Sequence, residues 1–112
     1  MFATINQLGY YFWVEKPTPH CKLSTVKLLV KAGKVKATVS AFNGARDLGI
    51  SDLAGMCRVV VALNTANFYR SMTTHADHKI WQDVYHASTQ HGEAYLKLTV
   101  IDDVLIVSFK EL

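Results

Sequence analysis

Cysteine is scarce in this chain of 112 residues. Its two cysteines, Cys21 and Cys57, form neither a CxxC pair nor a zinc-ligand spacing, so the sequence indicates no disulfide framework. Long apolar runs are also missing, because none approaches the roughly 20 residues that a membrane helix needs. The apolar piece at residues 10–14 lacks a basic leader and a small-residue cleavage site, and we do not interpret it as a signal peptide. We therefore expect a reduced, cytoplasmic protein with no membrane partner.

The signature motifs of several enzyme classes are absent as well. The sequence has no P-loop, no dinucleotide-binding fingerprint, no HExxH and no GxSxG. His75 and His78 stand three residues apart in a predicted strand or turn, and this spacing does not aim both imidazoles at one metal ion. We therefore expect no metal site and no cofactor.

The composition is that of a globular protein. Half of the residues are hydrophobic and 19% are charged, which argues against disorder. The length fits a single domain over residues 1–112, since domains typically have about 100–150 residues. The formal net charge of +3 and the isoelectric point near 8.9 are compatible with a nucleic-acid ligand and are weak evidence alone.

Two segments in the first half carry clear helix signals. Ser24 is the expected N-cap of a helix that runs to Ala32, before Gly33, and Ser51 is the expected N-cap of another that ends near Leu63. Apolar residues recur at helical spacing in both segments. The expected buried faces consist of Leu23, Val26, Leu29 and Val30 in one helix, and of Leu53, Met56, Cys57, Val60 and Val61 in the other.

The segment between these helices allows two interpretations. Residues 35–41 alternate as a short strand, whereas Ser40 could cap a short helix that runs to Leu48 and ends at Gly49. We expect both elements, in that order. Cys57, on the helix that follows, is expected to be a core thiol rather than a nucleophile.

Period-two alternation dominates the second half of the chain. Gly92 and the pair Asp102-Asp103 mark turns between strands. The predicted strands are residues 68–74, 79–86, 93–101 and 104–110. Helices followed by an antiparallel meander predict an α+β fold, with three helices packed on one face of a mainly antiparallel sheet and the other face free for a ligand.

Strand alternation assigns side chains to the two faces. In 93–101 the apolar set that includes Leu96 and Leu98 should cover the helices, which leaves Tyr95 and Lys97 outward. In 68–74, Phe68, Arg70, Met72 and Thr74 share one face, opposite Tyr69, Ser71 and Thr73. In 79–86, Gln82 shares a face with Ile80 and Val84. In 104–110, Lys110 lies on the face opposite Leu105, Val107 and Phe109.

The polar residues expected on the open face suit a phosphate-bearing ligand. Arginine offers paired donors to phosphate, lysine a point charge, and tyrosine a stacking ring with a hydroxyl. Single-stranded RNA is read by such aromatic and amide groups. The alternative is that Lys97 and Lys110 are ordinary solvated charges and that Tyr95 packs as an amphipathic side chain. Residues alone predict a small α+β domain that is compatible with RNA binding.

Several motifs resemble the MqsR family of bacterial toxins over residues 15–112. These are Thr18-Pro19-His20, Leu23-Ser24, Val26-Lys27, Gly55-Met56-Cys57, Phe68-Tyr69, Ser71-Met72-Thr73-Thr74, Asp77-His78, Ile80-Trp81-Gln82-Asp83-Val84-Tyr85, Tyr95-Leu96-Lys97, Thr99-Val100-Ile101 and Asp103 through Glu111. The resemblance implies a RelE-like α+β fold and a ribosome-independent mRNA interferase of a type II toxin–antitoxin system. Such an enzyme cleaves single-stranded mRNA at GC-containing triplets, chiefly GCU.

The resemblance also implies site residues. The family's catalytic group is a lysine, a glutamine and a tyrosine; here the glutamine is Gln82, the tyrosine is Tyr95, and Arg70 stands at the lysine position. Arginine keeps the positive charge but is effectively never deprotonated, so Arg70 can replace a lysine that only binds phosphate. The residues expected to bind substrate are Met72, Lys97, Lys110 and His20.

The implied chemistry is metal-free attack of the RNA 2′-OH on the adjacent phosphate. Arg70 would stabilise charge on the phosphoryl oxygens, Tyr95 would transfer a proton or orient the 2′-OH, and Gln82 would position the phosphate or a base. The implied partner besides mRNA is an MqsA-like antitoxin with a zinc-binding domain and a helix-turn-helix domain. The toxin–antitoxin complex would repress its own operon, so that the toxin reaches operator DNA only through the antitoxin.

Two rival functions remain open on sequence grounds. One is a non-catalytic RNA-binding or co-repressor module in which Arg70 marks lost chemistry. The other is a DNA-binding regulator, which no recognition-helix pair supports.

Residues 1–14 lie outside the resemblance and are expected to be an N-terminal extension. Val14-Glu15-Lys16 falls where family chains begin with Met-Glu-Lys. We therefore expect translation to start at a GTG codon for Val14.

Overall fold

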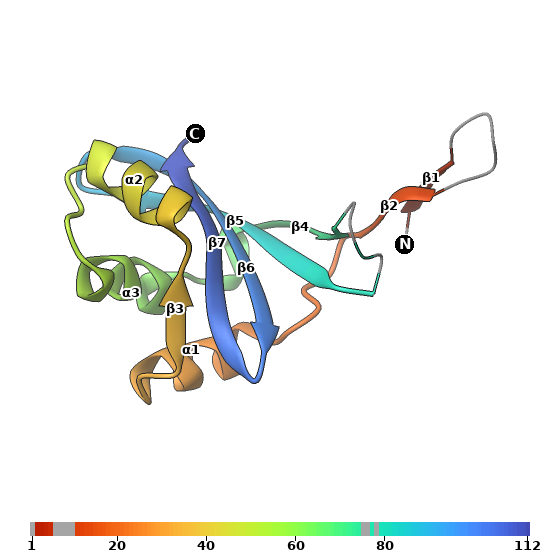
Figure 1. Cartoon of the computed structure of the whole chain (residues 1–112), viewed down its shortest axis with the longest axis horizontal. Helices are drawn as coiled ribbons and strands as arrows, with labels where there is room; N and C mark the ends of the chain where they lie inside the picture. Colours follow the sequence, from red (N-terminus) through yellow and green to blue (C-terminus); the bar gives the residue numbers. More distant parts are fainter. Residues whose placement is uncertain (1, 6–10, 75–76, 78) are drawn as a thin grey trace.

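The chain forms two layers, with helices on one side of a seven-stranded sheet (Figure 1). The structure is a computed structural model that describes residues 2–5, 11–74, 77 and 79–112, with side chains from Glu15 onward. The elements are β1 (Phe2–Ile5), β2 (Tyr11–Lys16), α1 (Leu23–Lys31), β3 (Val35–Ala37), α2 (Val39–Asp47), α3 (Leu53–Ala62), the 3₁₀ turn η1 (Thr65–Asn67), β4 (Phe68–Thr73), β5 (Trp81–Thr89), β6 (Gly92–Ile101) and β7 (Asp103–Glu111).

The sheet has the strand order β1-β2-β4-β5-β6-β7-β3. Its neighbours pair antiparallel except β3, which pairs parallel with β7 at the edge. The expected α+β fold, with three helices on a mainly antiparallel sheet, is therefore confirmed. The β1–β2 hairpin extends the sheet beyond β4, at the end of the molecule far from α2 and α3 (Figure 1). It was not predicted, although the aromatic residues at 11–13 are typical of a strand.

The helices form where the sequence indicates, but their first residues differ from the prediction. The side chain of Thr38 accepts a hydrogen bond from the Ala41 N–H, and that of Asp52 accepts one from the Gly55 N–H, so these residues cap α2 and α3. Ser40 and Ser51 are therefore not the caps. In α1 Lys22 holds the N-cap position without a side-chain cap, so the prediction for Ser24 is also wrong. Ser40 lies two residues after Thr38, and Ser51 lies directly before Asp52, so the sequence alone does not show which residue caps each helix.

The predicted stops and turns are confirmed. Gly33 and Gly49 follow α1 and α2 with φ values of 78° and 76°, which glycine adopts without a steric penalty. Asp102 has a φ of 64° in the tight β6–β7 turn, and Gly92 begins β6 after the β5–β6 turn.

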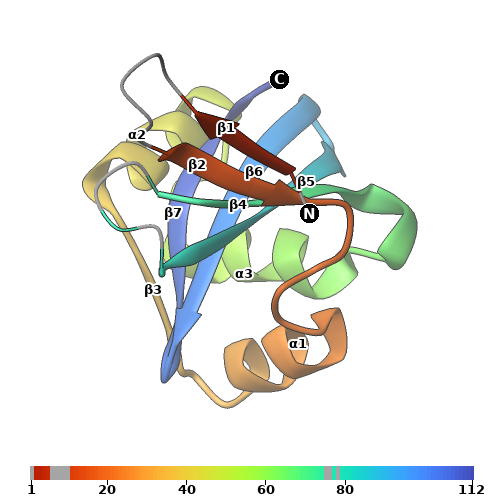
Figure 2. The ribbon, with the colours of Figure 1, turned by 90° about the vertical axis from the view of Figure 1, so that its right-hand side faces the viewer.

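One hydrophobic core joins all three helices to one face of the sheet. Met56 and Val60 of α3 are fully buried in it, together with Leu96 of β6 and Tyr85 of β5. The half-buried Cys57 packs against this core, as expected of a structural thiol. In Figure 2, α1 and α3 lie on the side away from the strands β1 and β2. The opposite sheet face carries no helix in the described part of the chain, which confirms the expected open face.

Two β-bulges change the predicted faces. Between Phe68 and Arg70 the pairing of β4 with β5 shifts, so Phe68 packs against the core while Arg70 stays on the open face. Tyr69 is 51% exposed and stacks on His86 of the open face, so its predicted place beside the buried Ser71 is wrong. A bulge adds one residue to a strand and shifts the alternation after it.

The second bulge lies where β6 pairs with β7. The register shifts between Lys97 and Leu98 of β6, and the buried residues of β7 are Val104, Ile106 and Phe109. The predicted apolar set Leu105, Val107 and Phe109 is therefore wrong except for Phe109. Lys110 does lie opposite Phe109, as predicted.

Among the described helices none is long and apolar enough to cross a membrane. The predicted placement of His75 and His78 lies outside the described residues.

Gly44 allows α2 to approach β7 closely. A Cβ added at Gly44 would overlap the carbonyl oxygen of Phe109. We expect Gly44→Ala to lower the free energy of unfolding by about 2 kcal/mol, because backbone rather than a flexible side chain must move. For a domain of this size that is a fall in Tm of roughly 10 °C, which thermal unfolding monitored by circular dichroism measures. Gly33→Asn is the control, since asparagine tolerates a positive φ; equal effects of the two changes would contradict the prediction.

Candidate functional site

The register of the sheet places the expected catalytic residues on the open face. Residues directly opposite each other on paired strands share a face. Arg70 is opposite Val84, Val84 is opposite Lys97, and Lys97 is opposite Ser108, so these side chains form one row across β4, β5, β6 and β7. A second row, two residues along β5, contains His86, Tyr95 and Lys110. Arg70, Tyr95, Lys97 and Lys110 therefore lie together, as the sequence predicts.

Tyr95 lies at the centre of a group of cations. The Nζ atoms of Lys110 and Lys97 are 5.2 Å and 5.9 Å from the centroid of its ring. Burial raises the pKa of the Tyr95 hydroxyl above its ordinary value, with the charge of Arg70 acting against this and Tyr69 adding to it. The phenol is therefore a proton donor at neutral pH.

Lys97 has the opposite perturbation. Its side chain is half-buried, and burial lowers the pKa of its ammonium group, which the charges of Lys110 and Arg70 lower further. Like charges kept this close favour an anionic ligand, because a phosphate would relieve their repulsion.

Arg70 is held from two sides. Its Nη1 atom donates a hydrogen bond to Oε1 of Glu15 at 2.9 Å, and the side chains of the two residues are 38% and 21% exposed. The guanidinium carbon lies 5.2 Å from the centroid of the Tyr69 ring. The buried Nε atom has no hydrogen-bond partner among the described residues. Glu15 of β2 thus fixes one edge of the guanidinium beside Tyr95.

Two aromatic residues that sequence reasoning missed complete this surface. The rings of Tyr69 and His86 stack with centroids 4.4 Å apart and planes at 19°. His86 and Tyr95 are tilted at 42° with centroids 6.3 Å apart. The strand alternation that placed Gln82 on this face also places His86 there, so the position of His86 could have been predicted from the sequence. Tyr69 was not, because the bulge that turns it outward has no clear sequence signal.

Gln82 and Met72 lie farther from Tyr95 than the sequence suggests. They oppose each other on β5 and β4, so both are on the open face, and both are half-buried. Gln82 is four residues from His86 along β5, which at about 3.3 Å per residue places it roughly 13 Å from the row of Tyr95. The structure therefore does not place the Gln82 amide in the same row as Tyr95.

His20 lies on the other face of the sheet. Its ring stacks on Trp81 with centroids 5.3 Å apart, and Nζ of Lys16 donates to its Nδ1 atom at 2.8 Å. The carboxylate of the buried Asp83 accepts hydrogen bonds of 3.0–3.1 Å from the backbone N–H groups of His20 and Cys21. Burial and the charge of Lys16 lower the pKa of His20, while Asp83 opposes them. The structure therefore does not bring His20 together with the other candidates.

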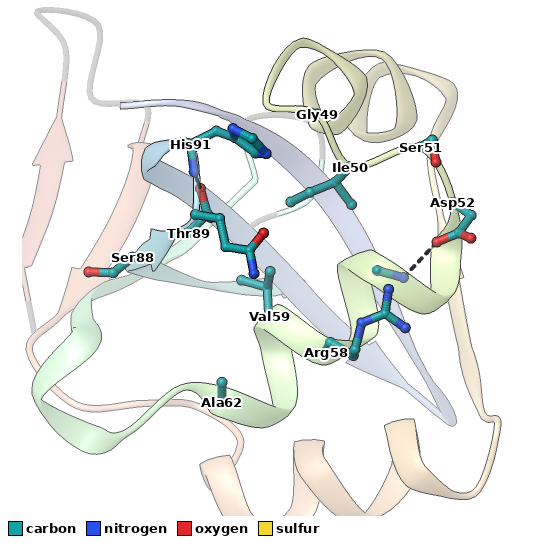
Figure 3. A pocket seen from close by; sticks show the side chains of 12 residues that line it. Gly49, Ile50, Ser51, Asp52, Arg58, Val59, Ala62, Ser88, Thr89 and His91 are labelled. Atoms are coloured by element: carbon teal, nitrogen blue, oxygen red, sulfur yellow. Dashed lines mark hydrogen bonds between the residues drawn. The ribbon is translucent and has the colours of Figure 1, made fainter.

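A pocket of about 650 Å³ lies apart from this surface, between α3 and the β5–β6 turn (Figure 3). Ile50, Val59 and Arg58 line it from the helix side, and His91 lines it from the turn. None of the candidate catalytic residues is part of its lining. No three His, Cys, Asp or Glu residues of the described part of the chain come together as metal ligands.

The open sheet face of this α+β domain gathers Arg70, Lys97 and Lys110 around the protonated Tyr95 phenol, an arrangement that suits a phosphate-bearing ligand. Comparison with known proteins is more specific. A family described as "Motility quorum-sensing regulator, toxin of MqsA" matches residues 18–111. The protein named "mRNA interferase toxin MqsR" from Escherichia coli (strain K12) is 57% identical over 98 residues, which cover 88% of this chain and 99% of that protein. The chain belongs to the MqsR toxin family, and the resemblance noted in its sequence is confirmed.

Proposed function

We propose that this chain is the toxin of a type II toxin–antitoxin system and acts as an endoribonuclease, an mRNA interferase that cleaves single-stranded mRNA independently of the ribosome. The observation that carries the proposal is the position of Tyr95. Its phenol is kept protonated on the open face, beside Arg70, Lys97 and Lys110. The chain that presents this group is 57% identical to a protein named as an mRNA interferase toxin.

The proposed reaction is attack of the RNA 2′-OH on the adjacent phosphorus. The P–O5′ bond breaks, and the products carry a 2′,3′-cyclic phosphate and a 5′-OH. Arg70 and Lys97 stabilise the charge that develops on the phosphoryl oxygens, because fixed cations at a half-buried site act more strongly than in water. Tyr95 donates a hydrogen bond or a proton to an oxygen of the same phosphate. The step uses no metal ion.

Substrate recognition is assigned to residues around this centre. Gln82 and Met72 lie on the open face beyond the Arg70 row, where the amide can hydrogen-bond a base and the thioether can contact it. Tyr69 offers a half-exposed ring for stacking. Lys110 binds phosphate, and His20 is in place only for RNA that reaches the other face. We infer a preference for GC-containing triplets, chiefly GCU, from the family.

The distribution of charge supports a long polyanionic substrate. Residues 16–46 contain no Asp or Glu, and their cations are Lys16, Lys22, Lys27, Lys31, Lys34, Lys36 and Arg46. Among the described residues the ion pair between Arg70 and Glu15 is the one salt bridge found. Cations without carboxylate partners attract phosphates, and binding then weakens steeply as salt rises.

The proposed partners are mRNA and a cognate antitoxin resembling MqsA, with a zinc-binding domain and a helix-turn-helix domain. The complex of the two proteins binds operator DNA through the antitoxin and represses the operon. The toxin acts in the cytoplasm, where its substrate is. Residues 15–112 form the toxin domain, and translation from Val14 stays a prediction.

The test is cleavage of a GCU-containing RNA oligonucleotide by the purified protein in EDTA. We expect one cut at the GCU site, with a 2′,3′-cyclic phosphate on the upstream product detected by mass spectrometry. Arg58→Ala is the matched control, since it removes an arginine outside the site. RNA binding without cleavage by the unmodified protein would support the non-catalytic module instead. Cleavage that EDTA abolishes would contradict the metal-free mechanism.

A further inference from the structure

The proposed cleavage requires a group that removes the proton of the 2′-OH. Arg70 cannot accept a proton, because a guanidinium is not deprotonated in proteins. Tyr95 is unsuited as well, since its raised pKa keeps it a donor. Gln82 has no titratable group. Lys97 already serves in the proposed reaction as a cation that stabilises the charge on the phosphoryl oxygens. The residues predicted from the sequence therefore leave the base of the reaction unassigned.

His86 occupies the position that such a base needs. It is directly opposite Tyr95 on the neighbouring strand, and its ring centroid is 6.3 Å from that of Tyr95. The two rings are tilted at 42° to each other on the same face of the sheet. Imidazole both accepts and donates protons near neutral pH.

Its neighbours hold His86 in place and leave its ring nitrogens available. Tyr69 stacks on one side of the imidazole at 4.4 Å. Nδ2 of Asn67, in the η1 turn, donates a hydrogen bond of 3.0 Å to the backbone carbonyl of His86. Neither ring nitrogen has a hydrogen-bond partner among the residues that the structure describes. The ring is therefore oriented by stacking, with its polar atoms free for a substrate.

We propose that His86 is a catalytic residue that accepts the proton of the attacking 2′-OH, with Tyr95 as the proton donor to the departing 5′-oxygen; this inference rests on the proposed function. The 2′-oxygen forms the new bond to phosphorus as its proton passes to a ring nitrogen of His86. The P–O5′ bond breaks as the Tyr95 phenol gives its proton to O5′. Solvent then returns a proton from the imidazolium to the phenolate, and both groups are reset.

The cations around Tyr95 support the phenolate that forms when its proton leaves. Two carboxylates lie beside these groups: Glu93 accepts a hydrogen bond from Ser88 at 2.9 Å, and Glu15 of β2 accepts one from Arg70 at 2.9 Å. The titratable and charged groups that face His86 are Tyr69 and Arg70 from β4, Glu93, Tyr95 and Lys97 from β6, and Lys110 from β7.

The experiment compares His86→Phe and His86→Ala with the unmodified protein on the GCU-containing RNA. Phenylalanine keeps a ring that stacks on Tyr69 but cannot accept a proton. We expect kcat to fall about 10²-fold in both variants, while binding of an RNA with a 2′-deoxy cleavage site stays within a factor of two or three. Added imidazole should restore part of the activity of His86→Ala and none of that of His86→Phe. His91→Phe is the matched control and should keep full activity.

The pH profile separates proton transfer from packing. In the unmodified protein we expect kcat/KM to fall as pH decreases below neutrality, because a protonated imidazole cannot act as a base. This acid limb should be absent in His86→Phe. Wild-type activity of His86→Phe with an intact acid limb would overturn the inference and leave the proposed function standing. Absence of cleavage by the unmodified protein would instead count against the proposed function itself.

Discussion

Replacing Arg70 by alanine is expected to lower kcat/KM for a GCU-containing RNA by about 10²–10³-fold, the usual effect of removing one preorganised charge donor from a developing oxyanion. Arg70 is the cation that Glu15 fixes by a hydrogen bond of 2.9 Å, in the row that also contains Lys97. Its loss removes the positive charge and leaves the carboxylate of Glu15 near the incoming phosphate. Single-turnover cleavage in EDTA measures the effect.

Arg70→Lys determines what the arginine contributes. If the charge alone acts, lysine should retain activity within about tenfold, since both residues bind phosphate and lysine acts as a point charge. If the paired donors of the guanidinium hold the phosphate, Arg70→Lys should lose nearly as much as Arg70→Ala. The double variant Arg70→Ala/Glu15→Gln should recover part of the lost binding, because the carboxylate charge is gone. Full activity of Arg70→Ala would contradict the assignment.

Much of the fold follows from local signals in the sequence. Helical spacing located α1 and α3, and glycine marked the ends of α1 and α2. Period-two alternation located β4 to β7 within a few residues. Caps were predicted less well, because neighbouring Thr, Ser and Asp residues all suit an N-cap and only packing selects one. The strands β1 and β2 were missed, because β2 joins the sheet through long-range pairing with β4 and β1 is attached only through β2.

The sequence predicted which side chains lie on the open face of the sheet, but not how they are placed relative to one another. Alternation put Tyr95 and Lys97 outward because β6 has no irregularity before Lys97. It failed for Tyr69, where a bulge inserts a residue. The separation of Gln82 from Tyr95 and the place of His20 on the other face depend on register and on the anchoring of a loop by Asp83. Neither the strand register nor the anchoring of this loop can be predicted from the local sequence pattern.

Tyr95→Phe is expected to reduce kcat by about 10²–10³-fold, because proton transfer to or from a reacting group contributes this much. The change removes one oxygen and keeps the ring that Lys110 and Lys97 contact at 5.2 Å and 5.9 Å, so folding and RNA affinity should be nearly unchanged. The pH dependence gives a further expectation. The raised pKa keeps the phenol protonated beyond pH 10, so loss of activity at lower alkaline pH comes from Lys97, whose pKa is lowered from 10.5. That alkaline limb should therefore persist in Tyr95→Phe.

A substrate with sulfur in place of the 5′-oxygen tests the role of Tyr95 as a proton donor. A thiolate leaves without protonation, so it does not need the phenol. With this substrate Tyr95→Phe should approach the rate of the unmodified protein, whereas His86→Phe should stay slow because the 2′-OH must still lose its proton. Equal defects of Tyr95→Phe on the oxygen and sulfur substrates would show that the phenol orients the phosphate rather than protonating the leaving group. Cleavage would then depend on Arg70 and Lys97 to stabilise the departing alkoxide directly.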